Sequence, residues 1–444
     1  MSSKLDAQVL KNIVRTLVRM ALATLVGLGT SVIVARQLGP GGNGLYALAT
    51  LLPVTLGTLT NGGVIYSNVF FLANGKTGLR QALPMNFILW AILSVLGVAG
   101  FFGYQEIFGE EIKDSAVALA GICSFPPYLL QLFLSSLIQG RQDFRYHSYA
   151  TLAPVVLCFV FLLISYSAGY RSAAYAVACY GASMAVASVL TFYFLIKLLR
   201  AEPSEKRELD EFFTKYFRYG VFSYIGNIFA LVHQRINYYF VTIFLGLTGV
   251  GVFAIATQIA ERLLVLTTAV TTVALPRLAS DYGESNGAQL TAQLCRLTFQ
   301  LSVVAAFVLA VLAQIFLHEI FGANFAGALL PLQILLAGSA FVAVTRILAN
   351  DFTARGRPQL NVSTAFIPVL VNIAACLLLI PKFGLNGAAW ATFISSTANL
   401  AVKMRIFSKI SDVPYWNTLW PKLEDFRMYM GLLRRFFPRG INAY

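Results

Sequence analysis

The sequence carries little charge for its length. Charged residues make up 12% of its 444 positions, and 58% of the residues are hydrophobic. Soluble globular domains carry about 25% charged residues, so too few remain here to cover a water-exposed surface of this size. The composition excludes a soluble protein and predicts one whose main solvent is lipid.

Motifs of catalysis, nucleotide binding and metal binding are also missing. No GxSxG, Walker A or HExxH pattern occurs, and His147, His233 and His318 are scattered along the chain. The five cysteines form no CxxC pair and lie in apolar runs, where they act as packing residues. No interval between apolar runs is long enough for a globular domain. We therefore predict no enzyme activity, no ATP-driven pumping within this chain, no cofactor and no bound metal.

Long apolar runs dominate what is present. A transmembrane helix needs about 20 apolar residues, and the sequence contains about twelve such runs. They lie near 13–35, 45–72, 84–104, 115–138, 149–169, 174–198, 216–245, 249–275, 296–318, 326–348, 360–380 and 385–407. We predict an all-α integral membrane protein with four parts. These are an N-terminal six-helix half (1–198), a cytoplasmic linker (199–215), a C-terminal six-helix half (216–407) and a cytoplasmic tail (408–444).

A glycine-rich motif occurs twice, in Leu38–Ala49 (LGPGGNGLYALA) and in Leu245–Ala256 (LGLTGVGVFAIA), 207 residues apart. Three glycines, an aromatic residue and two alanines match between the copies. Each copy lies between two apolar runs and predicts a hairpin turn between two helices. A motif recurring at half the chain length predicts two related halves, an architecture known among secondary transporters. Six spans in each half predict a pseudo-two-fold axis along the membrane normal, with a central cavity.

Lysine and arginine are distributed unequally between the two faces of this predicted bundle. One face carries most of them, whereas the other holds only Arg36, Lys113, Arg171 and Lys382. The richer face is cytoplasmic by the positive-inside rule, so we predict that both termini lie in the cytoplasm. The net charge of +14 then reflects topology, and no nucleic-acid partner is predicted.

The tail contains one amphipathic segment. Its apolar residues fall at spacings of three and four, which predicts a single stripe along a helix. They are Leu423, Phe426, Met430, Leu433 and Phe437. Charged residues between them prevent a membrane crossing, so we predict a helix lying on the anionic cytoplasmic leaflet. The alternatives are a disordered tail and docking onto a glycosyltransferase.

Several turns together resemble one family of membrane proteins. They are Ala35–Pro40 with Gly44–Ala47, Leu275–Leu278, Ala354–Arg357, and Ile380–Ala389 followed by Ala391 and Thr392. In order and spacing they resemble Wzx-type polysaccharide and O-antigen flippases of the multidrug/oligosaccharidyl-lipid/polysaccharide exporter superfamily.

This resemblance implies transport of a polyprenyl-pyrophosphate-linked oligosaccharide from the inner to the outer leaflet of the cytoplasmic membrane, by alternating access of the two halves. It implies membrane lipids, a polysaccharide polymerase or glycosyltransferases as partners, and H⁺ or Na⁺ as a coupling ion. Where the family often carries Arg-x-Asp, this chain has Arg235, Ile236 and Asn237, which removes a carboxylate suited to ion coupling. The alternatives are a drug/cation antiporter of the same superfamily and a membrane glycosyltransferase or ligase.

Three ionisable residues are predicted near the bilayer midplane, where charge is costly and marks function. Counting from the turn at 1.5 Å per residue places Arg235 about 15 Å deep, and Glu261 and Arg262 roughly 18–20 Å deep. Guanidinium groups bind the oxygens of a pyrophosphate bidentately, so these residues are candidates for substrate binding. The alternative is a structural ion pair between Arg235 and Glu261.

Further candidates rest on weaker signals. Arg19 and Arg346, like Arg15 and Arg218, lie near cytoplasmic helix ends; they either anchor topology by snorkelling or contact the phosphates of the cargo. Tyr238 offers a ring for sugar faces, as do Tyr66, Tyr224 and Tyr239, although aromatic belts explain most membrane tyrosines. His233 is either a polar cavity residue or a proton carrier.

Overall fold

The structure, a computed structural model, describes residues 2–108, 115–202, 212–280, 287–355, 357, 359–420 and 422. Over this part of the chain the regular elements are all helices, without a β-strand. The first six α-helices are α1 (Ser2–Thr60), α2 (Val64–Ala73), α3 (Leu79–Phe108), α4 (Ser115–Gly140), α5 (Phe144–Ser167) and α6 (Ala173–Arg200). They are followed by α7 (Phe212–Ser280), α8 (Gly287–Phe321), η2 (Ala323–Ala328), α9 (Leu329–Ala354), α10 (Gln359–Ser411) and η3 (Tyr415–Thr418).

Three of these helices are hairpins, each interrupted at one glycine. The glycines are Gly39 in α1 (φ 65°, ψ −176°), Gly246 in α7 (φ 68°, ψ −172°) and Gly384 in α10 (φ 57°, ψ −132°). In α7 the hydroxyls of Tyr238 and Thr257 are hydrogen-bonded across the turn. The described residues contain nine helices long and apolar enough to cross a membrane. Because three of the nine turn back, the chain makes about twelve crossings, which confirms the predicted all-α membrane fold.

Several element boundaries differ from the predicted spans: α8, for example, begins at Gly287 and not near 296, and α9 ends at Ala354 and not near 348. The predicted span 45–72 is broken between α1 and α2, where the Asn61 side chain caps the end of α1 and accepts a hydrogen bond from the Gly63 amide. Gly63 has a φ of 83°, a left-handed backbone angle that ends the right-handed helix. Residues with a side chain rarely adopt this angle, which explains the glycine at this position. At the other end, α10 runs to Ser411 and so passes the predicted span end at 407. The amphipathic helix predicted within 423–437 lies outside the described residues.

The repeated glycines pack the two hairpins against each other. A Cβ atom at Gly44 would lie 1.9 Å from the carbonyl oxygen of Leu247, and one at Gly251 would lie 1.8 Å from that of Pro40. Pro40 and Leu247 are themselves equivalent under the 207-residue offset. The two contacts are therefore symmetry mates, as expected for two halves related by a pseudo-two-fold axis. Small residues allow this backbone approach, which is the usual means of packing membrane helices closely.

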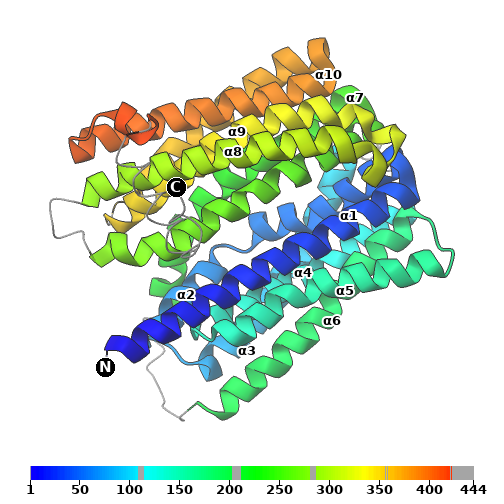
Figure 1. Ribbon diagram of the computed structural model, residues 1–444. Coiled ribbons are helices and arrows are strands. Elements are labelled where there is room, and N and C mark those ends of the chain that lie inside the picture. Colours follow the sequence, from blue (N-terminus) through cyan, green and yellow to red (C-terminus); the bar gives the residue numbers. More distant parts are fainter. Residues whose placement is uncertain are drawn as a thin grey trace, which may run out of the picture.

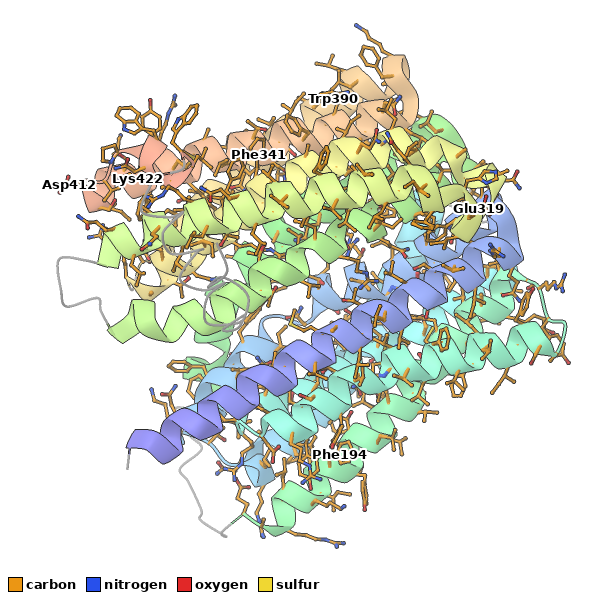
Figure 2. All side chains as sticks on the ribbon, in the orientation of Figure 1. Phe194, Glu319, Phe341, Trp390, Asp412 and Lys422 are labelled. Atoms are coloured by element: carbon orange, nitrogen blue, oxygen red, sulfur yellow. The ribbon has the colours of Figure 1, made fainter. Side chains whose placement is uncertain are left out.

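The two halves form bundles that lie side by side, α1–α6 in blue to green and α7–α10 in green to red (Figure 1). Besides a close contact between Gly63 and Gly220, where a Cβ atom at Gly63 would lie 2.2 Å from the Gly220 carbonyl oxygen, they meet at the end of the molecule where α1 and α7 turn back (Figure 1). Glu319 lies at that end of the second bundle, and Asp412 and Lys422 lie at the opposite end (Figure 2). The cytoplasmic face predicted from the charge asymmetry is therefore the end with Asp412 and Lys422.

Apolar side chains cover both the inside and the outside of the molecule. One buried core cluster joins the halves and includes Leu48 from α1 and Phe253 from α7. On the outside, Val95 of α3 and Phe307 of α8 are each 70% exposed. Such exposure is costly in water and favourable in hydrocarbon, so the outward faces of these helices suit a lipid environment.

Candidate functional site

The α7 hairpin brings Arg235 and Glu261 together. The Arg235 Nη1 atom lies 3.1 Å from Glu261 Oε1, and both side chains are partly exposed. The guanidinium carbon of Arg235 also lies 5.9 Å from the centre of the Tyr238 ring. Tyr238 is buried, with its hydroxyl 2.9 Å from that of Thr257. Tyr238 therefore packs beside Arg235, and the ion pair stays partly accessible.

Arg262 follows Glu261 in sequence but points toward the other half of the molecule. Its Nη2 atom lies 2.9 Å from where a Cβ atom would stand at Gly27 of α1, so the missing side chain of Gly27 makes room for the guanidinium. The buried Nε atom of Arg262 has no hydrogen-bond partner among the described residues. Part of this guanidinium therefore remains available to a ligand.

A cavity of about 870 Å³ lies in the C-terminal half, bounded by α7, α9 and α10 with Tyr66 from α2. Glu261, Arg262 and Arg346 all line it. The Glu261 carboxylate interacts electrostatically with both arginines. The structure thus brings together three of the six predicted site residues on one wall, with Arg235 attached through its ion pair to Glu261.

Arg19 lies elsewhere. Its Nη1 atom donates a 2.6 Å hydrogen bond to Thr151 Oγ1 of α5, and it is not among the described residues that line the cavity. The tyrosines beside Tyr238 link the two halves instead of presenting open ring faces. Tyr239 is hydrogen-bonded to Thr55 at 3.1 Å, and Tyr224 donates to the carbonyl of Leu59.

Hydrogen bonds between polar side chains connect α7 to α10 on another wall of the cavity. His233 Nε2 lies 3.1 Å from Ser395 Oγ, and Asn237 donates to Thr392. Asn237 Oδ1 also accepts from the thiol of Cys376 at 3.1 Å. His233 is therefore a partnered polar residue at the cavity, and Asn237 takes part in helix packing.

The sequence analysis missed one charged residue of the cavity. Lys403 counted there only as one of the cytoplasmic charges, yet its side chain is 8% exposed and lines the cavity. The available signal was its spacing from Thr392, Ser396 and Asn399, which places all four on one face of α10. Across the described residues, no group of three His, Cys, Asp or Glu side chains could hold a metal ion.

Comparisons with known proteins agree with this architecture. An uncharacterized membrane protein of Methanocaldococcus jannaschii is 23% identical over 296 residues, covering 65% of this chain and 58% of that protein. A candidate O-antigen transporter of Shigella flexneri is 22% identical over 400 residues, covering 86% of this chain and 93% of the other. The lipid II flippase MurJ in its inward-closed conformation has the same fold, with a TM-score of 0.65 at 16% identity over 95% of this chain and 98% of MurJ.

The family match is more extensive than these pairwise similarities. Residues 9–282, more than half of the chain, match the family described as polysaccharide biosynthesis protein. This range includes the first half from residue 9 onward, the α7 hairpin and the ion pair. It confirms the resemblance to polysaccharide and O-antigen flippases that the turn motifs indicate. The chain is a multi-pass membrane protein that belongs to the polysaccharide biosynthesis protein family.

Proposed function

We propose that the protein moves a polyprenyl-pyrophosphate-linked oligosaccharide from the inner to the outer leaflet of the cytoplasmic membrane. The observation that carries this proposal is the charge on the cavity. Glu261 is the one acidic side chain on its described wall, and it is engaged by Arg235. Arg262 and Arg346 form no salt bridge within the described residues. Their fork-shaped guanidinium groups suit the adjacent oxygens of a pyrophosphate.

The two hairpins supply a means of moving the cargo. Gly44 and Gly251 hold the outer turns in backbone contact, and the halves can rock about such a contact. The charged headgroup then crosses inside the protein, where arginines replace the water it loses. The polyprenyl tail can remain in lipid throughout the movement.

Cavity charge also argues against the alternative of a drug/cation antiporter. A cationic drug would meet Arg262 and Arg346 in a medium of low dielectric constant, where like charges repel strongly. Antiport of cations would instead favour an excess of carboxylates.

A translocation assay tests the proposal. The purified protein would be reconstituted into vesicles with a radiolabelled polyprenyl-pyrophosphate oligosaccharide on one leaflet, and an impermeant glycosidase would report its arrival on the other. We expect protein-dependent transfer of the intact lipid. Transfer of a cationic dye without transfer of the lipid would support the antiporter, and chemical conversion of the sugar without a change of leaflet would support the transferase.

We further propose that both termini are cytoplasmic and that the Pro40 and Gly322 turns are external. The Lys and Arg asymmetry supports this orientation. Single cysteines introduced at Ser2, Gly322 and Tyr444 would be labelled in intact cells with an impermeant thiol reagent, in a background without the native cysteines. We expect labelling only at Gly322; labelling at Ser2 would reverse the orientation.

A further inference from the structure

One face of the second arm of α10 carries a continuous row of polar side chains. Thr392, Ser396, Asn399 and Lys403 follow one another at spacings of four, three and four residues, and all four line the cavity. We call this row the α10 polar stripe. Polar side chains inside a membrane protein are costly and usually face a cavity or a partner.

Three of the four stripe residues lack partners. The Ser396 hydroxyl and the Asn399 Oδ1 atom are buried without a hydrogen bond in the described part of the chain. Lys403, 8% exposed, forms no ion pair there. Across the cavity, Asn361 Oδ1 on the first arm of α10 is unpartnered as well. Unmet hydrogen bonds are expensive in a dry interior, so their concentration around one cavity points to a polar ligand.

The direction of the Lys403 side chain is informative because, at its position in α10, it could extend either toward cytoplasmic water or into the cavity. A lysine near a cytoplasmic helix end normally extends its ammonium group toward water. Side chains on a helix lean toward its N-terminus, which here points away from the cytoplasmic end of α10. Lys403 is close enough to His233 for the two groups to interact electrostatically, and its side chain is buried in the cavity wall. Its charge is therefore held inside the membrane.

The balance of charge then suggests what Lys403 meets. Arg235, Arg262, Arg346 and Lys403 stand against the single described carboxylate, Glu261, which leaves an excess of three positive charges. A pyrophosphate diester offsets roughly two of them. The remaining positive charge is that of Lys403 in the stripe. The hydroxyl and amide groups beside it can form hydrogen bonds with the hydroxyls of a sugar.

We propose that the α10 polar stripe binds the first sugars of the cargo, and that Lys403 pairs with a carboxylate on one of them. The cargo is then an acidic oligosaccharide, such as one containing a uronic acid close to the pyrophosphate. This inference rests on the proposed function and adds the chemical class of the sugar.

Binding of three synthetic lipids to the purified full-length protein tests the inference. Each carries the same polyprenyl pyrophosphate: one with a uronic-acid disaccharide, one with the neutral hexose disaccharide, and one without sugar. We expect the acidic lipid to bind at least about tenfold tighter than the neutral one, as a charge-assisted hydrogen bond requires. Lys403→Gln should weaken the acidic lipid about tenfold more than the neutral one and should not weaken the sugar-free lipid to the same degree, whereas Lys403→Arg should retain much of the preference. Lys409→Gln, at an exposed position of the same helix outside the cavity wall, is the matched control.

The outcomes separate this inference from the function on which it rests. Equal binding of the acidic and neutral lipids by the unaltered protein overturns it, whether or not the variants fold. Equal weakening of the sugar-free lipid by Lys403→Gln also overturns it, because Lys403 would then contact a carrier phosphate. If the unaltered protein binds none of the three lipids, the proposed function itself fails.

Discussion

The two halves of the molecule share their turns but not their charges. Gly39 and Gly246 adopt almost the same backbone angles, and Gly44 and Gly251 make the same contact with the opposite half. The architecture was therefore kept in both copies, because each half needs the other's glycine to pack.

The charged residues of the cavity, in contrast, are not repeated in the first half. Subtracting the 207-residue offset from Arg235, Glu261 and Arg262 gives Leu28, Val54 and Thr55 in the first half. None of these is ionisable. Packing two hairpins closely requires small residues in both copies, whereas binding one anion requires cations on only one side of the cavity. The comparison teaches that the fold is symmetric and the candidate site is not.

The largest effect is expected where the two hairpins cross at Gly44 and Gly251, which we call the crossing point. Adding one methyl group there should disrupt the symmetric packing of the two halves. Gly44→Ala and Gly251→Ala each place a Cβ atom within 2 Å of a backbone carbonyl oxygen, at 1.9 Å and 1.8 Å. We expect each variant to lose about 3 kcal/mol or more of stability and to accumulate poorly. Thermal unfolding in detergent and the yield of monodisperse protein measure this.

Gly41→Ala is the control for that pair, because its nearest non-local atom would be Thr248 Oγ1 at an ordinary 3.7 Å. It should unfold close to the temperature of the unaltered protein. If Gly44→Ala were destabilising and Gly251→Ala harmless, the two contacts would not be equivalent and the symmetry argument would fail.

The candidate site is asymmetric, so substitutions should impair translocation only in the half that carries the charges. We expect Arg235→Ala to reduce translocation by at least about tenfold, with normal membrane levels, while Leu28→Ala at the equivalent position has little effect. Arg235→Lys should recover only part of the activity, since a lysine keeps the charge but loses the bidentate fork. Translocation in vesicles, normalised to protein content, gives the measurement.

A double mutant shows whether Glu261 acts with Arg235 or only holds it. If the pair is purely structural, Arg235→Ala combined with Glu261→Ala should be milder than the two separate effects added together. Full translocation by Arg235→Ala at normal protein level would remove Arg235 from the site altogether.

Much of the fold could be predicted from sequence because a bilayer imposes length and hydropathy on every crossing. The repeated glycine motif located the hairpins, and two of the three hairpin glycines fall inside its copies. The break between α1 and α2 escaped prediction because apolar residues continue across it. Its cause is local, in the cap formed by Asn61 and the positive φ of Gly63.

The candidate site was harder to predict because it depends on side-chain direction. Depth along the helix brought Arg235 and Glu261 to one level, and the hairpin joins them. Depth alone gave no sign that Arg19 turns to Thr151 of α5. Lys403 was counted as a topology residue because its sequence position is near the cytoplasm, and only the helix face reveals that it lines the cavity.

The smallest effect should come from the turns themselves, where strain acts without a clash. Gly39 and Gly246 combine a φ near 65° with a ψ near 180°, a region that is essentially restricted to glycine and costs other residues about 1–3 kcal/mol. No atom lies within 4 Å of a Cβ built at either position, so alanine adds only this backbone cost. We therefore expect Gly39→Ala and Gly246→Ala to destabilise equally, by less than the crossing-point variants, and to leave translocation measurable. Paired thermal unfolding of the two variants decides it: a difference between them larger than about 1 kcal/mol would mean that the halves no longer share the same turn.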